Sequence, residues 1–208
     1  MKYTKIPTET FDRIQLNAGV LVTDFDPEKG SIEDGKILGP TTGGISVELT
    51  PEFVDFGDDI DNCPKNMLEL KQLDSWEAKI SGTFVGMTAE IAKLTIGAAD
   101  INEDKIVPRR DVLTTDFSDI WWIGDYGSSH DEKTGGCIAV HLMNALSTGG
   151  FKIQTSDKEK GNFDFEFTGH VSMSAQDVVP MEIYVKDETE DTSAEGLTAK
   201  EPVAVAVK

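Results

Sequence analysis

The sequence lacks the features of a disulfide scaffold, a secreted precursor or a membrane-spanning protein. Among its 208 residues are two cysteines, Cys63 and Cys137, too few for a disulfide framework and not in a CxxC pair. The first residues contain no apolar stretch like that of a signal peptide, and no apolar run is long enough to span a bilayer. We therefore expect a protein made in a cytoplasm, with two ordinary reduced thiols and no membrane partner.

Basic residues are also scarce. The chain has 19 Lys and Arg against 38 Asp and Glu, which gives a formal net charge of −19. Phosphate binding is driven by Lys and Arg side chains that release counterions, so this chain is a poor ligand for nucleic acid. The same charge repels an anionic membrane surface. Solubility alone explains most single carboxylates.

Motifs for catalysis are missing as well. The sequence has no GxSxG, P-loop, Rossmann or HExxH pattern. Its three histidines, His130, His141 and His170, are scattered, and His141 falls in a strand pattern that favours a hydrogen-bonded core or surface role. Paired carboxylates for glycoside hydrolysis stay open, because their separation depends on the fold. The sequence predicts no catalytic residue and no cofactor.

Two acidic segments have part of the spacing of a calcium-binding loop. The first has candidates at positions one, three, five and twelve: Asp100, Asn102, Asp104 and Asp111. There Lys105 replaces the turn glycine and Pro108 interrupts the loop. The second, Asp24 to Glu28, has no carboxylate at position twelve. We predict no metal site in either.

Two stretches show the alternation of a half-buried strand. In Gly161 to Met173, three phenylalanines at 163, 165 and 167 alternate with polar residues. In Trp76 to Phe84, apolar residues occupy every second position. A period of two places the apolar side chains on one face and the polar ones on the other. We expect these strands to form the centre of an antiparallel sheet with one wet face.

Further elements follow from composition. A helix is predicted over Thr88 to Ala99, capped by Thr88 and packed on a sheet. The adjacent Trp121 and Trp122 should point to opposite faces of a strand, and both should be buried in a core or at a subunit contact. A hairpin turn is expected at Ser147 to Gly150, and Ile101 to Thr115 is expected to be a connection. Other predicted strands are Ile45–Leu49, Asp119–Tyr126, Cys137–Leu146, Phe151–Ser156 and Val179–Val185, with one or two more within Phe11–Phe25. The count is about eight strands and one helix in one domain.

A long acidic segment, Thr50 to Leu73, does not fit a plain loop. It carries many apolar side chains, which argue against disorder. We expect an arm that packs on a neighbouring subunit, and a local helix at Asn66 to Leu73 packed on its own domain stays open. Residues 1–10 are expected to form an extended arm, residues 1–186 the domain, and residues 187–208 a flexible acidic tail.

Several tracts in this order resemble the major tail tube protein of long-tailed bacteriophages and prophages of Gram-positive bacteria. The resemblance spans about Phe11 to Val185. It is carried by PEFVDFGDDIDNCPKN, LKQLDSWEAKISGTFV, IGAAD followed by VPRRD, DIWWIGDY, AVHLMNALSTGGF, FDFEFTGH and VVPMEIYV. It implies a mainly β fold, an antiparallel β-sandwich or half-barrel with one short flanking α-helix and a long arm. It also implies hexameric rings that stack into a tube for the genome.

The resemblance gives roles to two sets of residues. An acidic lumen would repel DNA and let it slide. Candidates for lining it are Glu48, Glu77, Lys79, Asp164 and Glu166. Candidates for contacts between rings are Phe53, Phe56, Ile60, Met67 and Leu70. Partners would be other copies of the chain, the tape measure protein, other tail proteins, and double-stranded DNA that passes without specific binding. The location would be the virion tail.

Three alternatives stay open. A tube subunit of a contractile tail or of a phage-tail-like bacteriocin would share the ring fold. A monomeric β-sandwich binding module, for instance for carbohydrate, would need exposed aromatic residues or a concave site. An enzyme ranks last, because no site is visible. The sequence also leaves open which sheet face would line a lumen.

Overall fold

The computed structural model describes residues 6–7, 10, 14–15, 17–28, 32, 37–126 and 136–186. The expected tail at 187–208 and His130 lie outside these residues, as does most of the expected arm at 1–10. Every structural statement below concerns the described residues.

The described chain is mainly β, as the sequence predicts. It contains one α-helix, α1 (Ala89–Ile96), and two short 3₁₀ turns, η2 (Leu68–Leu70) and η3 (Thr114–Asp116). Its strands are β1 (Val20–Val22), β2 (Thr41–Asp55), β3 (Lys71–Phe84), β4 (Ala99–Asn102), β5 (Lys105–Pro108), β6 (Ser118–Asp125), β7 (Cys137–Ser147), β8 (Phe163–Thr168) and β9 (Met181–Lys186). The strand count within the described residues is therefore nine, one more than expected.

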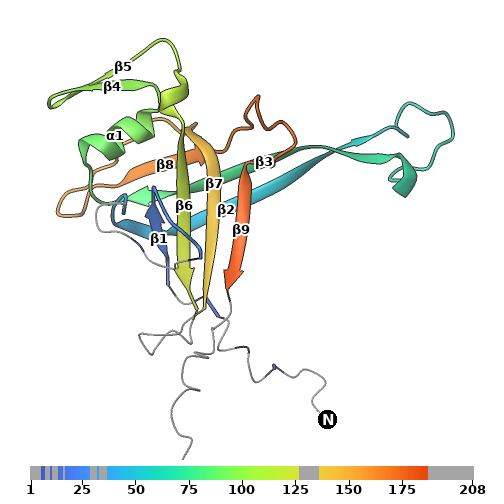
Figure 1. Cartoon of the computed structure of the whole chain (residues 1–208), viewed down its shortest axis with the longest axis horizontal. Helices are drawn as coiled ribbons and strands as arrows, with labels where there is room; N and C mark the ends of the chain where they lie inside the picture. Colours follow the sequence, from blue (N-terminus) through green and yellow to red (C-terminus); the bar gives the residue numbers. More distant parts are fainter. Residues whose placement is uncertain are drawn as a thin grey trace, which may run out of the picture.

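Seven strands form one antiparallel sheet that folds over on itself. The strand order is β1-β6-β7-β8-β3-β2, and β9 pairs with β7. The first part of β7 pairs with β6 and β9, whereas Leu146 and Ser147 at its end pair with β8. Strands β8, β3 and β2 consequently run across β6, β7 and β9 in Figure 1. This is the expected antiparallel sandwich or half-barrel with one short helix.

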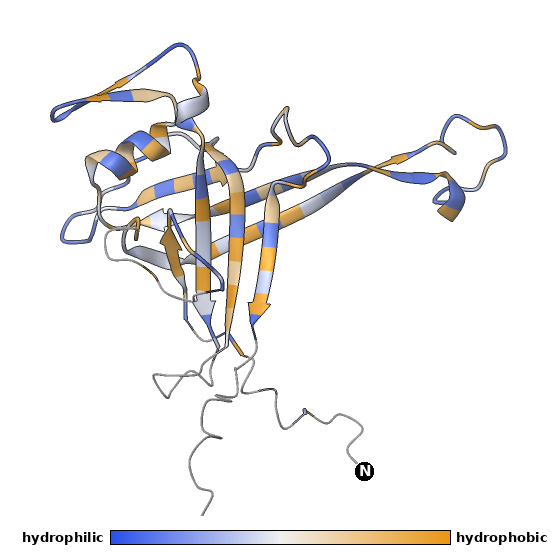
Figure 2. Cartoon of the chain, in the orientation of Figure 1, coloured by the Kyte–Doolittle hydropathy of each residue, from blue (hydrophilic) through white to orange (hydrophobic). Residues whose placement is uncertain are grey.

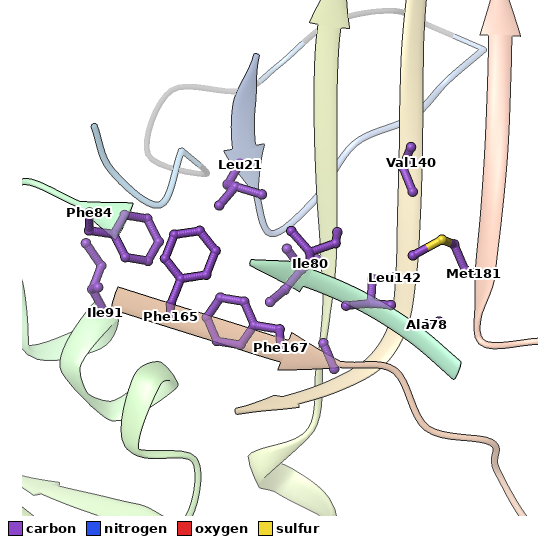
Figure 3. Packing of buried hydrophobic residues seen from close by; sticks show 12 residues of the cluster. Leu21, Ala78, Ile80, Phe84, Ile91, Val140, Leu142, Phe165, Phe167 and Met181 are labelled. Atoms are coloured by element: carbon purple, nitrogen blue, oxygen red, sulfur yellow. The ribbon is translucent and has the colours of Figure 1, made fainter. Parts of the chain in front are cut away.

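The core lies between these two layers and follows the predicted alternation. Ala78, Ile80 and Phe84 of β3 are fully buried, and so is Phe167 of β8. Figure 3 shows how they meet Phe165, whose ring centroid lies 4.3 Å from that of Phe84. From the other layer come Leu21, Ile120, Val140, Leu142 and Met181. Burial of each large side chain contributes about 1.5–3 kcal/mol, so this cluster holds the two layers together.

A second cluster covers the opposite side of β6. Trp121 is 7% exposed, meets Phe25 edge to face at 5.5 Å, and stacks on His141 with ring centroids 4.0 Å apart. Trp122 points the other way, is half-buried, and donates from Nε1 to the carbonyl oxygen of Ala18 at 3.0 Å. The two tryptophans point to opposite faces, as predicted. Burial is confirmed for Trp121 and only partial for Trp122.

Helix α1 closes one end of the core. Its N-cap is Thr88, whose Oγ1 accepts a hydrogen bond from the backbone N–H of Ile91 at 3.2 Å. The side chain of Ile91 reaches Phe84 in Figure 3. Gly97 ends the helix with φ +86°, a conformation that favours glycine. The predicted helix is confirmed, but it ends three residues earlier than expected.

Two predictions at the strand level are wrong, and a third gives a strand that is too short. The connection at Ile101 to Thr115 contains most of the β4–β5 hairpin, whose turn places the non-glycine Glu103 at φ +54°. The expected strand Phe151–Ser156 is an exposed loop, apart from one isolated bridge at Gln154, because no layer covers it. The strand that follows β7 in the sheet is β8. The short strand predicted at Ile45–Leu49 is the middle of the 15-residue β2.

Candidate functional site: a polar sheet face and a projecting hairpin

The five candidate lumen residues lie together on one side of β2, β3 and β8. In the register Glu48 pairs with Lys79, Glu166 pairs with Ser81, and Asp164 pairs with Thr83. Glu77 lies two residues before Lys79 and so shares its side of the strand. This polar face comprises Thr42, Ser46, Glu48, Thr50, Glu52, Ser75, Glu77, Lys79, Ser81, Thr83, Asp164, Glu166 and Thr168. The sheet's other side carries the core phenylalanines.

Carboxylates supply most of the charge of the polar face, and hydroxyl groups donate hydrogen bonds to them. It carries five carboxylates and one ammonium group. Four hydroxyl-to-carboxylate hydrogen bonds are Thr83 to Asp164 at 2.8 Å, Thr148 to Glu166 at 2.9 Å, Ser75 to Glu52 at 3.0 Å and Ser46 to Glu48 at 3.1 Å. These bonds leave the charges in place and restrict the side chains that carry them.

Lys79 is the cation in the middle of this face. Its Nζ lies 2.6 Å from Oε1 of Glu77. That hydrogen-bonded contact is the largest cause of the raised pKa of Lys79. Burial acts against it, and the charges of Glu77, Glu166 and Glu48 raise the pKa further. Its positive charge is therefore matched locally by carboxylates.

Glu52 belongs to the polar face and is not among the five candidates. The strand expected from the sequence stops at Leu49, which placed Glu52 in a loop. The alternation of Ser46, Glu48, Thr50 and Glu52 continues the period of two and is the signal that identifies it.

The polar face ends at an edge strand. Within the described residues β2 pairs only with β3 over residues 41–55, so one side of a 15-residue strand presents its N–H and C=O groups outward. Long unpaired edges are templates for pairing with another chain unless they are covered. A second copy is one such partner.

The predicted arm is a β-hairpin rather than a loop. Residues 53–73, here called the arm, are the distal parts of β2 and β3 with the turn that joins them, and Figure 1 shows them projecting far from the body. A bulge between Glu52 and Phe53 marks the start of the arm. The open alternative of a helix at Asn66–Leu73 is wrong, because only η2 forms there and its Leu68 is 85% exposed.

The tip of the arm has a defined local structure. One carboxylate, Asp55, accepts hydrogen bonds from the backbone N–H of Gly57 at 2.9 Å and of Asn66 at 3.1 Å. The N–H of Phe56 donates to the carbonyl oxygen of Leu70 at 3.0 Å. These bonds order the turn without help from the body.

The five candidate contact residues divide into two groups. Phe53, Phe56 and Ile60 are 54%, 56% and 52% exposed. Met67 and Leu70 are half-buried within the tip. Further exposed apolar residues of the arm, outside the candidate set, are Val54, Leu68 and Leu73. Figure 2 shows hydrophobic positions along the arm and at its tip, where the body offers no cover. The arm thus presents exposed apolar side chains that the described part of the body does not cover.

The histidines and acidic segments considered in the sequence lie apart from one another in the described structure. Nε2 of His141 lies 3.3 Å from Oδ2 of Asp119, and Nδ1 of His170 lies 3.2 Å from the carbonyl oxygen of Asn144. In the first calcium-like segment Asp100 forms an ion pair with Arg109 at 2.9 Å, and a β-hairpin replaces the loop. Nowhere in the described parts of the chain do three His, Cys, Asp or Glu side chains gather in a way that could hold a metal.

Among the described residues, no helix has the length and apolar character needed to cross a membrane. Comparison of the sequence with protein-family models and with curated proteins gives no match.

Proposed function

We propose that the chain is the structural subunit of a bacteriophage tail tube, in which hexameric rings stack around an acidic channel for double-stranded DNA. The observation that carries this proposal is the polar face, which runs across three strands and ends at the long edge of β2. This function is also the one implied by the resemblance to tail tube proteins. Other copies of the chain are the main partners, with the tape measure protein and other tail proteins at their contacts.

The edge of β2 supports closure between copies. If an edge strand of one copy pairs with a sheet edge of the next, the polar faces join into one wall and the exposed edges disappear. The side chains on the other side of this sheet fill the core of each copy. A ring built this way would present carboxylates and hydroxyl groups to its channel.

The chemistry of the polar face suits a conduit. DNA binds proteins through Lys and Arg contacts to phosphate, and an acidic wall repels it. Both lysines that the structure shows in contact with the face have partners there: Lys79 lies against Glu77, and Nζ of Lys160 donates to the hydroxyl oxygen of Thr42 at 2.7 Å. DNA would therefore pass without a favourable contact to hold it.

The arm supports contacts between rings. In the part of the chain that the structure describes, Phe53, Phe56 and Ile60 are each more than half exposed. Burial of each against another copy would contribute about 1.5–3 kcal/mol, offset in part by the entropy lost on association. Contractile tails and phage-tail-like bacteriocins would use the same two surfaces. The binding-module alternative gains no support from the tryptophans, because Trp121 is buried and Trp122 donates a hydrogen bond to the carbonyl oxygen of Ala18.

Negative-stain electron microscopy of the purified chain at high concentration, with light scattering for its mass, tests the proposal. We expect rings or tubes with a central channel. A monomer at every concentration would contradict it and would favour the binding module. A Glu48→Lys/Glu166→Lys variant tests the lumen separately, because it replaces two carboxylates of the polar face by cations. If the variant still forms tubes, DNA should bind inside them.

A further inference from the structure

The end of the molecule opposite the arm carries a surface of opposite charge. Residues 150–160, here called the end loop, follow β7 and lie across the body from the arm along the longest axis (Figure 1). Phe151 and Ile153 of this loop are 43% and 55% exposed. Three lysines, Lys152, Lys158 and Lys160, lie in the same loop with two carboxylates, a net charge of +1.

The arm has the complementary composition. It carries five carboxylates and two lysines, a net charge of −3, beside exposed Phe56 and Ile60. Each of the two surfaces thus combines apolar side chains with a net charge opposite in sign to that of the other. In a chain of net charge −19, most surfaces would repel an acidic arm, so a basic apolar loop is a selective partner.

We infer that the tip of the arm of one copy docks on the end loop of a second copy. The arm and the end loop lie at opposite ends of one molecule, so the arm does not cover its own end loop. A contact between unlike surfaces of identical chains is head-to-tail, and its repetition produces rings or open helical stacks. The inference rests on the proposed self-assembly and adds the surface that receives the arm.

A second apolar surface is a weaker receiver. A groove at the root of the arm is lined by Leu73, Trp76, Val171 and Val178. Asp74 and Asp177 also line it, and both would repel the carboxylates of an arm tip. Charge therefore favours the end loop over this groove.

Charge reversal on each surface tests the inference. Lys152→Glu/Lys158→Glu changes two exposed lysines of the end loop, and Asp58→Lys/Asp59→Lys changes two exposed carboxylates of the arm tip while leaving Asp55 in place. We expect each pair to weaken assembly by roughly tenfold or more in critical concentration. The four changes combined restore the attraction and should bring assembly back toward that of the unmodified chain.

Lys105→Glu/Arg110→Glu is the matched control, because it makes the same change in charge on two exposed residues in and just after β5. It should assemble as the unmodified chain does, and all variants should keep the same unfolding temperature. An end-loop pair that assembles normally overturns the inference, as does a control that fails equally. If Val178→Asp, a change in the groove, prevents assembly and the end-loop pair does not, then the groove and not the end loop receives the arm. If the unmodified chain forms no assembly, the proposed function itself fails.

Discussion

Strands β2 and β3 run through two regions that differ in what covers them. In the body, Ile80 and Phe84 are fully buried between two layers. In the arm, Phe53 of β2 and Phe56 of the turn that follows it are more than half exposed. Both regions have paired backbones and apolar residues, so the covering layer makes the difference. The body should therefore determine the stability of a single copy, and the arm should determine whether rings of copies stack.

The largest effect should come from the core. Phe167→Ala removes a fully buried ring, and we expect a loss of about 3–5 kcal/mol in the free energy of unfolding. The matched change Phe56→Ala, in the exposed arm, should cost no more than about 0.5 kcal/mol. Urea denaturation of both variants measures the difference. Equal losses would mean that the arm belongs to the folding unit.

A buried carboxylate gives the next effect. The side chain of Asp116 is fully buried, pairs with Arg109, and accepts a hydrogen bond from the N–H of Leu113 at 2.8 Å. Asp116→Ala leaves the half-buried Arg109 without this partner, which should cost about 3 kcal/mol. Thermal unfolding measures this, with Asp111→Ala, an exposed carboxylate of the same segment, as the neutral control. A loss no larger than that of the control would show that the ion pair contributes nothing to stability.

Asp55 makes similar hydrogen bonds in the arm, where the consequence should be local. Asp55→Ala removes the acceptor for the N–H groups of Gly57 and Asn66. We expect faster hydrogen exchange at residues 56–70 and a change in global stability near 1 kcal/mol or less. Protection factors measured by mass spectrometry would contradict this if the body exchanged faster as well.

The smallest effect should come from Lys79. Its pKa is raised in the folded chain, so its stabilising contribution is complete below the ordinary lysine pKa and is lost as the pH rises through the folded pKa. The unfolding temperature of the unmodified chain should therefore fall slightly more than that of Lys79→Gln as the pH passes about 10.4. Parallel curves for the two proteins would show that Glu77 and its neighbours do not stabilise the ammonium group.

The body could be predicted from sequence because burial on one side imposes a period of two. Phe163, Phe165 and Phe167 alternate with polar residues, and β8 forms where they stand. The five polar-face candidates followed from the same rule, since a strand with one face in a core sends the intervening residues to the other. Where a strand packs one face against a core, the alternation in its sequence therefore matches the burial seen in the fold.

The arm could not be predicted in this way, because its strands have no core to impose alternation. Phe53 and Val54 are adjacent and both exposed, so the sequence indicated an arm but not the paired strands within it. The sequence did not predict the β4–β5 hairpin, because Glu103 and not glycine occupies its left-handed turn position. Phe151–Ser156 alternates like a strand but has no layer to pack on. In each case the deciding contact, or its absence, lies outside the local sequence.

One comparison tests the division between body and arm most directly. Electron microscopy and light scattering would be applied to the unmodified chain and to Phe53→Ser/Phe56→Ser at equal concentration. We predict tubes for the unmodified chain, and single unstacked rings with an unchanged unfolding temperature for the variant. Tubes from both proteins, or a monomeric unmodified chain, would contradict the assignment of ring stacking to the arm.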